Sequence, residues 1–227
     1  MSKKVLSFQQ NQEGVMHRFS DNTTVHGDIL VGADGAHSSV RQHLYKTLDK
    51  EGLLPKSDTK AMSRGYISLV ETTEALDPKQ YPGMIGITAI ADEQFKISDW
   101  VPQRNQKLMH SIRHFKTMYG TLGDLFDVTN IEHVSKVYFE DMSFETWNHG
   151  RMVLIGDAAH KLLPSSGAGA VNAIQDTVLL ANHIYDIYPT SYENIRTALQ
   201  EYKEGRFEAI KEQYPQSYMA AKLRYGH

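Results

Sequence analysis

The sequence predicts an α/β fold in which a separate β-sheet is inserted. Two short apolar runs, residues 28–34 and 152–156, have the composition of buried strands, and each is followed by a loop and a helix-like segment. A run of successive strand-like segments lies between them. Because strand-then-helix segments build layered α/β cores and successive strands pair with one another, these observations together predict an α/β core with α+β elements.

The N-terminal segment has the pattern of a hairpin that leads into the first strand-and-helix unit. Residues 4–9 and 15–20 are strand-like, and the segment 11–14 between them has turn composition. A second turn is expected at 21–24, where Asn22 tolerates a left-handed backbone. The apolar run 28–34 then predicts a buried strand, and a short helix is expected from Ser38 to Tyr45.

The middle of the chain is less regular. Residues 64–72, 84–91 and 95–101 have strand-like composition and are interrupted by prolines and a glycine. Apolar residues at helical spacing predict an amphipathic helix over 104–119. A further strand is expected over 131–139.

The C-terminal third predicts one strand and two long helices. The run 152–156 is expected to be a buried strand that opens into a loop. The strongest helical pattern covers 170–188, and a last helix is expected over 191–213, ending before Pro215. On the first of these helices, the residues expected to face the core are Ala173, Val178, Ala181 and Ile184.

The composition of the chain argues against several classes of protein. The chain has 227 residues, a formal net charge of −3 and no cysteine. A concentrated basic face is absent, so the sequence argues against a nucleic-acid partner. The lack of cysteine excludes disulfides and thiolate ligands, and no apolar run is long enough for a signal peptide or a membrane span. These features predict a soluble, cytoplasmic protein.

The first motif is the segment 27–41, which places Asp34 and Gly35 at the end of a buried strand. Ligand crevices in open α/β sheets lie at such strand ends. Ser38 and Ser39 begin the following helix, whose free N–H groups would favour an anion, and Arg41 adds a fork-shaped donor. The alternative is that Asp34 or Ser38 only caps the helix.

The second motif is the segment 150–176, in which a buried strand ends in Gly156 and Asp157. Two small alanines follow, Pro164 stiffens the loop, and Gly167 and Gly169 open the long helix. The positive end of that helix would stabilise a ring system that becomes anionic on reduction.

The second motif allows three other interpretations. Asp157 and His160 could bind a metal, but no further cluster of carboxylates and histidines stands nearby. Gly167 and Gly169 could begin a dinucleotide fingerprint, but Asn172 stands where the third glycine is required. Plain strand–loop–helix packing remains open.

Taken together, the two motifs resemble a known family. Asp-Gly-x-x-Ser-x-x-Arg (34–41) is followed about 120 residues later by Gly-Asp-Ala-Ala-His-x-x-x-Pro-x-x-Gly-x-Gly (156–169). This order and spacing, with Ala173 and Asp176 on the next helix, resemble the p-hydroxybenzoate-hydroxylase-like (aromatic-ring hydroxylase) FAD monooxygenases, in particular their fungal branch. The resemblance covers the whole chain, the middle only in outline.

The resemblance implies a set of cofactor contacts. Asp157 would hydrogen-bond the ribityl chain of FAD, Pro164 and the loop 167–169 would lie against the flavin ring, and Asp34, Gly35 and Arg41 would touch FAD or serve NAD(P)H use. No catalytic acid or base and no metal ligand is expected. The implied cofactor-binding residues are Asp34, Gly35, Arg41, Gly156, Asp157, Ala158, Pro164, Gly167, Ala168, Gly169 and Ala170.

The resemblance also implies an activity and a domain plan. The activity is NAD(P)H-driven hydroxylation or epoxidation of a small organic substrate through a flavin C4a-hydroperoxide. Residues 1–50 and 146–227 would belong to the FAD-binding domain, and 51–145 to a substrate-domain sheet with a helix. A reductase or oxidase that uses the same fold without oxygen insertion stays an alternative.

The chain departs from the family pattern at its start. The family opens with a strand, Gly-x-Gly-x-x-Gly and a helix that bind the ADP half of FAD, and no such segment occurs here. We therefore expect an N-terminally truncated domain with an exposed sheet edge, through which copies can associate. The alternative function is a non-catalytic remnant that binds FAD weakly or not at all.

Overall fold

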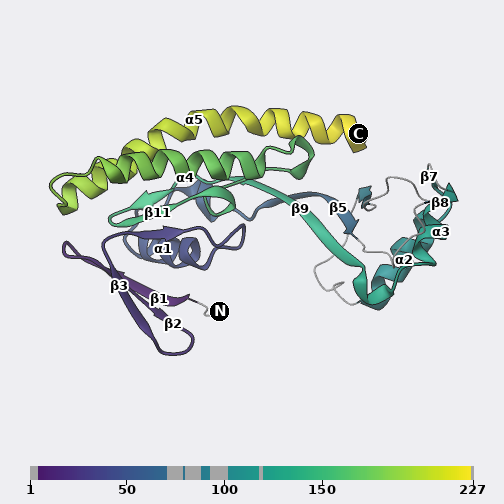
Figure 1. Cartoon of the computed structure of the whole chain (residues 1–227), viewed down its shortest axis with the longest axis horizontal. Coiled ribbons are helices and arrows are strands. Elements are labelled where there is room, and N and C mark those ends of the chain that lie inside the picture. The colour runs from purple at the N-terminus through teal and green to yellow at the C-terminus, as the bar shows by residue number, and fades with distance from the viewer. Residues whose placement is uncertain (1–4, 71–78, 80–87, 93–101, 118–119, 226–227) are drawn as a thin grey trace. The chain divides into compact units, whose positions relative to one another are not determined.

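The computed structural model describes residues 5–70, 79, 88–92, 102–117 and 120–225 (Figure 1). The chain divides into two compact units. Unit 1 comprises Met1–Ser63 and Glu140–His227, and unit 2 comprises Arg64–Phe139. The expected 95–101 strand lies outside the described residues.

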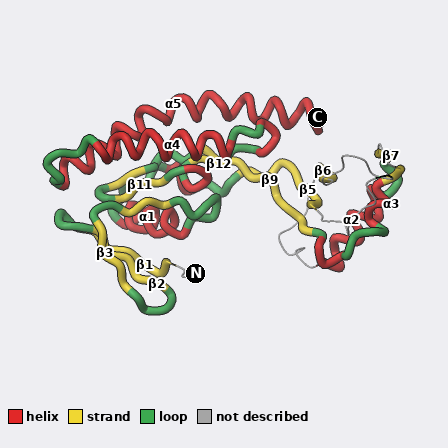
Figure 2. The backbone as a smooth tube through the Cα atoms, viewed as in Figure 1, coloured by secondary structure: helices red, strands yellow, loops and turns green. Residues whose placement is uncertain are grey.

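Unit 1 begins with the predicted hairpin, drawn in yellow in Figure 2. Strands β1 (Val5–Gln10), β2 (Val15–Phe19) and β3 (Thr24–Gly27) form an antiparallel sheet. Asn22 in the second turn has φ of 64°, which is the left-handed conformation that the sequence allowed for. Both turns are therefore confirmed.

The two predicted apolar strands lie side by side in unit 1. Strand β4 (Leu30–Gly32) pairs in parallel with β11 (Met152–Leu154), and β10 (Asn148–His149) pairs antiparallel with β11. In this sheet β4 is the end strand in the order β10-β11-β4. Because the two strands are parallel, the loops that follow them leave the sheet at the same edge.

Helix α1 (Ser39–Lys50) follows β4 and covers the core with one face. Val40, Leu44 and Leu48, at a spacing of four residues, are buried. A short turn, η1 (Lys56–Thr59), leads out of this region, where the carboxylate of Asp58 accepts the backbone N–H groups of Glu145 and Thr146. These bonds join the two chain segments that build unit 1.

Two long helices complete unit 1 and lie side by side (Figure 1). They are α4 (Gly169–Tyr185) and α5 (Tyr192–Tyr225). The predicted end of the last helix before Pro215 is wrong, because α5 continues through this proline. Beyond it, Ser217 and Ala221 are buried and Ser217 Oγ donates to the carbonyl of Leu163 at 3.1 Å, so tertiary contacts extend the helix past a residue that normally ends one.

The predicted core side of α4 is also partly wrong. The buried residues are Asn172, Asp176 and Leu180, at a spacing of four, whereas Val178 is 56% exposed and Ala181 is exposed. The buried polar side chains have partners on α5, which hydrophobic periodicity alone does not reveal. Ala173 and Ile184 are half-buried.

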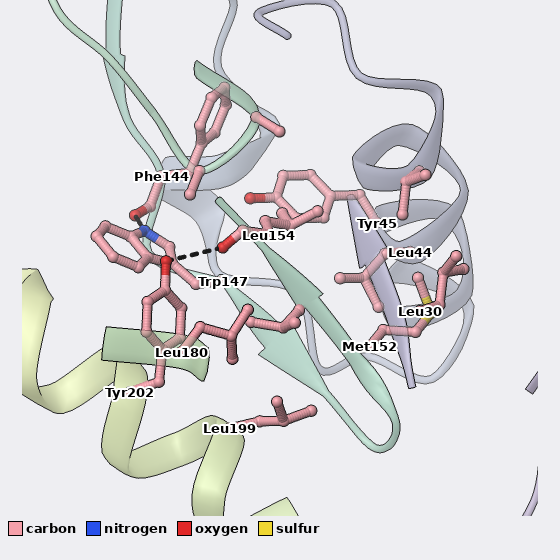
Figure 3. Packing of buried hydrophobic residues seen from close by; sticks show 14 of the residues in the cluster. Leu30, Leu44, Tyr45, Phe144, Trp147, Met152, Leu154, Leu180, Leu199 and Tyr202 are labelled. Atoms are coloured by element: carbon pink, nitrogen blue, oxygen red, sulfur yellow. Dashed lines mark hydrogen bonds between the residues drawn. The ribbon is translucent and has the colours of Figure 1, made fainter. Parts of the chain in front are cut away.

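The hydrophobic core of unit 1 lies between the three-stranded sheet β10-β11-β4, α1 and α5 (Figure 3). Trp147 and Tyr202 are fully buried, and each satisfies its polar atom with a backbone carbonyl. Trp147 Nε1 donates to Phe144 at 2.7 Å, and Tyr202 Oη donates to Leu154 at 3.2 Å. Burial of such a side chain contributes roughly 1.5–3 kcal/mol, so these residues fix α5 against β11.

Unit 2 contains the shorter elements of the middle segment. Strands β9, β5 and β6 are neighbours in this order, and β7 and β8 form a separate two-stranded sheet. The predicted strands 64–72 and 131–139 correspond to β5 and to the β9 region, but the latter begins as a short 3₁₀ turn before the strand. The elements are β5 (Ser63–Val70), β6 (Thr88–Asp92), α2 (Pro102–Ile112), β7 (Lys116–Thr117), β8 (Gly120–Thr121), α3 (Leu122–Phe126), η3 (Ile131–His133) and β9 (Ser135–Ser143).

The predicted helix over 104–119 ends earlier than expected, at Ile112. Residues 116–117 instead pair with 120–121 as β7 and β8, and Phe115 is 55% exposed. Thr121 and Asp124 then form a capping box that starts α3. Gly120 is left-handed, with φ of 109°, and a new helix starts directly after it. The chain therefore changes direction where hydrophobic periodicity predicted a continuous helix.

Candidate functional site

A pocket of about 680 Å³ lies where the loops after β4 and β11 meet the start of α4. It gathers seven of the predicted cofactor residues from segments more than a hundred residues apart. They are Gly35, Gly156, Asp157, Pro164, Gly167, Gly169 and Ala170. The parallel pairing of Leu154 with Gly32 brings the two loops to one edge of the sheet, where ligand crevices of α/β proteins form.

Glycines form an open surface in this pocket. A Cβ added at Gly35, Gly167 or Gly169 would meet no atom within 4 Å, and the first two have φ of 82° and 65°. Their backbone is therefore accessible, and a flat ligand can approach it closely. This open backbone leaves room for the flat ring that the second motif predicts.

The N-terminus of α4 borders the same pocket. Its N-cap residue, Ala168, makes no side-chain capping bond, and the first turn holds no acidic residue. The helix dipole therefore presents partial positive charge to the pocket without a side chain of the helix to neutralise it. Negative charge on a bound group would be stabilised there by about 0.3–1 kcal/mol or more.

A charged pair stands beside the helix terminus. Lys161 Nζ lies 2.6 Å from the carboxylate of Asp157, four residues earlier, and both side chains are partly exposed in the pocket. Lys161 was not among the predicted residues, and the spacing of four residues to Asp157 is the signal that could have indicated it. The pair places one acceptor and one cation within reach of a ligand.

Two polar side chains of the first motif bond the start of α1. Asp34 accepts the N–H groups of Ser39 at 2.6 Å and Val40 at 3.3 Å, and Ser38 is the N-cap, accepting from Arg41 N. The start of α1 is therefore occupied by the protein's own oxygens, and these N–H groups are not free for an anion. Asp34 and Ser38 therefore both cap this helix.

Arg41 is buried and acts as a bridge between the two motifs. Its guanidinium donates to the carbonyl of Ala158 at 2.8 Å and to that of Ala36, and it lies 4.0 Å from the ring centre of Phe144. Asp34, Arg41, Ala158 and Ala168 do not line the pocket. Their roles at a cofactor remain predictions.

A buried ionic network lies behind the pocket. Asp176 on α4 is fully buried, and its carboxylate accepts from Gly156 N at 2.9 Å, His160 Nε2 at 2.6 Å and Arg206 Nε at 2.8 Å. Burial alone would raise the pKa of Asp176, but the bonds from His160, Arg206 and Gly156 outweigh it and the pKa is lowered. The Nε2 atom of His160 is thus paired with this carboxylate.

A larger hollow, of about 1140 Å³, lies along the β1–β2 hairpin. Its lining includes Gln10, Glu13, His26, Asp28 and Glu51. None of the predicted cofactor-binding residues lines it, and the smaller pocket at the strand ends is therefore the candidate site. Across the described ranges, no group of three or more His, Asp or Glu side chains is arranged to hold a metal ion.

The fold and the site together define a class. Parallel strand ends, accessible glycine backbone and an uncapped helix N-terminus are the features of an α/β protein that binds a nucleotide-type cofactor. Residues 1–213 match the family model described as FAD binding domain, and the chain belongs to this family. The family resemblance seen in the two motifs is confirmed.

The curated relatives are fungal enzymes. The chain is 27% identical over 257 residues to the FAD-dependent monooxygenase olcE of Penicillium canescens, covering 98% of this chain and 55% of that protein. It is 26% identical over 251 residues to the FAD-dependent monooxygenase ptmM of Penicillium ochrochloron, covering 96% and 58%. The chain therefore spans about half the length of the curated relatives it matches.

Solved structures of the same fold are aromatic hydroxylases and related flavoproteins. 2,6-dihydroxypyridine-3-hydroxylase from Arthrobacter nicotinovorans has a TM-score of 0.73 at 19% identity, covering 99% of this chain and 65% of that one. HpxO of Klebsiella pneumoniae, complexed with FAD and uric acid, has a TM-score of 0.69 at 20% identity, covering 99% and 58%. These likenesses confirm the predicted fold class. None of the described helices combines the length and apolar character needed to cross a membrane.

Proposed function

We propose that this chain forms the flavin side of the FAD site of a monooxygenase that uses NAD(P)H to hydroxylate or epoxidise a small organic substrate. The observation that carries the proposal is the pocket in which the Gly35 loop, the Asp157 loop and the uncapped start of α4 converge. The names of the fungal relatives support the reaction class. Unit 1 would hold FAD, and unit 2 would belong to the substrate domain.

The chain's own residues would bind and orient the cofactor. Asp157 would accept a hydrogen bond from a ribityl hydroxyl, and the backbone at Gly167 and Gly169 would lie against the ring. The start of α4 would stabilise the negative charge of the reduced ring. The chemistry that FAD supplies when bound is two-electron exchange with NAD(P)H and activation of molecular oxygen.

The proposal is tested by titrating the purified 227-residue chain with FAD and following flavin fluorescence. Binding to the folded chain is expected, and Asp157→Ala should raise the Kd at least tenfold because it removes the acceptor beside the pocket. The matched control is Glu193→Ala, which breaks the exposed Glu193–Arg196 pair on α5, away from the pocket, and should leave the Kd within twofold.

Gel filtration of the same mixture provides the second readout. A flavin absorption band that elutes with monomeric protein supports the proposal, and NADH and NADPH oxidation can then be compared. A colourless protein peak would contradict it for these 227 residues and would favour the alternative of a non-catalytic form. Equal Kd values for Asp157→Ala and the parent chain would remove Asp157 from the site.

A further inference from the structure

Asp176 connects the two walls of the candidate pocket. Its Oδ2 accepts the N–H of Gly156, in the loop after β11, and its Oδ1 accepts from Arg206 on α5. The same guanidinium donates through Nη2 to Asn172 Oδ1 at 2.7 Å, in the first turn of α4. The carboxylate of Asp176 therefore binds the Gly156–Asp157 turn directly, and it binds the first turn of α4 through Arg206.

The turn that Asp176 holds is conformationally demanding. Gly156 has φ of 57°, and a Cβ placed there would lie 3.0 Å from the Cβ of Ala173. Gly156 is buried, so its N–H has no access to water and needs an acceptor at this point. Asp176 is that acceptor, and the position of Asp157, one residue further, depends on this turn.

Packing alone does not require a charged network around Asp176. An apolar group of similar shape can replace a buried ion pair at little or no cost in stability, so a buried charge is weak evidence of a purely stabilising role. Here the charge is surrounded by donors from three elements: Gly156 in η4 (Gly156–Ala158), His160 in β12 (His160–Lys161) and Arg206 in α5. Because hydrogen bonds are directional, they hold these three residues in one relative position, which apolar packing alone would not do.

We propose that Asp176 is a positioning residue of the cofactor site, which fixes the Gly156–Asp157 turn against the start of α4, with Arg206 and His160 holding its carboxylate in place. This inference rests on the proposed function for its link to FAD. The positioning itself is a property of the chain alone, and it can be measured without a cofactor.

The test compares Asp176→Asn with Asp58→Asn in the 227-residue chain. Asp58 is a second buried carboxylate of unit 1 that accepts two backbone N–H groups and does not line the pocket, so it controls for general destabilisation. Amide hydrogen exchange at Gly156–Ala159 should accelerate at least tenfold in Asp176→Asn and less than twofold in Asp58→Asn. The Kd for FAD should rise at least tenfold only in Asp176→Asn.

Each outcome decides between the two proposals. Equal exchange at Gly156–Ala159 in the two variants would overturn the positioning role, whatever happens to FAD binding. If the parent chain binds no FAD, the proposed function fails, and the exchange comparison still decides the role of Asp176. If Asp176→Asn does not fold, Arg206→Lys replaces it, because lysine keeps the charge but cannot bond Asp176, Gln175 and Asn172 together. It should accelerate exchange at the same four amides, and unchanged exchange would again overturn the role.

Discussion

Several motif residues of this protein form hydrogen bonds with residues far away in the sequence. Arg41 and Ala158 are 117 residues apart and share a hydrogen bond, and Asp176 reaches back 20 residues to Gly156. Their residue types could be read from the sequence as motif members. Their partners could not, because each bond depends on how two distant segments come together.

At Gly156, alanine should destabilise the protein and disturb the pocket. The left-handed backbone costs an L-residue about 1–2 kcal/mol, and the new Cβ would have to displace Ala173, so we expect a loss of roughly 3 kcal/mol in the free energy of unfolding. Gly52→Ala is the matched control: φ is 70° and no neighbour lies within 4 Å, so only the backbone cost of about 1–2 kcal/mol should appear. Urea unfolding measures both, and equal losses would contradict the contact with Ala173.

Among the elements, α4 shows most clearly what periodicity can and cannot predict. Its existence and its start at the glycine loop followed from composition, and the helix is present from Gly169. Its orientation did not follow, since Asn172 and Asp176 are buried by bonds to α5 while Val171, Ile174 and Val178 are exposed. Hydrophobic periodicity assumes that polar side chains face water, and a buried network reverses this assumption.

This orientation leads to a pairwise test on α4. Leu180 is 4% exposed and belongs to the core cluster, so Leu180→Ala should cost about 2–5 kcal/mol in this chain. Val178, two residues away, is 56% exposed, and Val178→Ala should change the free energy of unfolding by less than about 0.5 kcal/mol. Thermal and urea unfolding of the two variants provide the comparison. The reverse order of effects would mean that α4 is rotated from its position here.

At the scale of the whole molecule, three tyrosines in unit 1 make the free energy of unfolding depend on pH in the alkaline range. Burial is the largest cause that raises the pKa of Tyr45, Tyr202 and Tyr214, followed by the nearby carboxylates Asp58, Asp176 and Asp141 respectively. In the unfolded chain these phenols ionise near pH 10. The folded state therefore retains protons that the unfolded state loses as pH rises.

The resulting pH dependence has a definite sign. The three protonated tyrosines contribute fully to the free energy of unfolding below about pH 10. Above that pH the contribution is lost, at roughly 1.4 kcal/mol per pH unit for each phenol. Absorbance at 295 nm should show these phenols ionising only together with alkaline unfolding. Tyr214→Phe should make the slope of stability against pH shallower by about one third. An unchanged slope would show that Tyr214 ionises in the folded protein.

The sequence by itself determined the α/β class, the two strand-end motifs, the glycine loop and the flavin family, because each depends on residue types at short, fixed spacing. The tertiary structure decided the role of Arg41 as a bridge, the core face of α4 and the continuation of α5 through Pro215. It also decided that Asp176 and Arg206 meet behind the pocket. These features depend on long-range hydrogen bonds and burial, which compete with local preference and have no signature in the spacing of neighbouring residues.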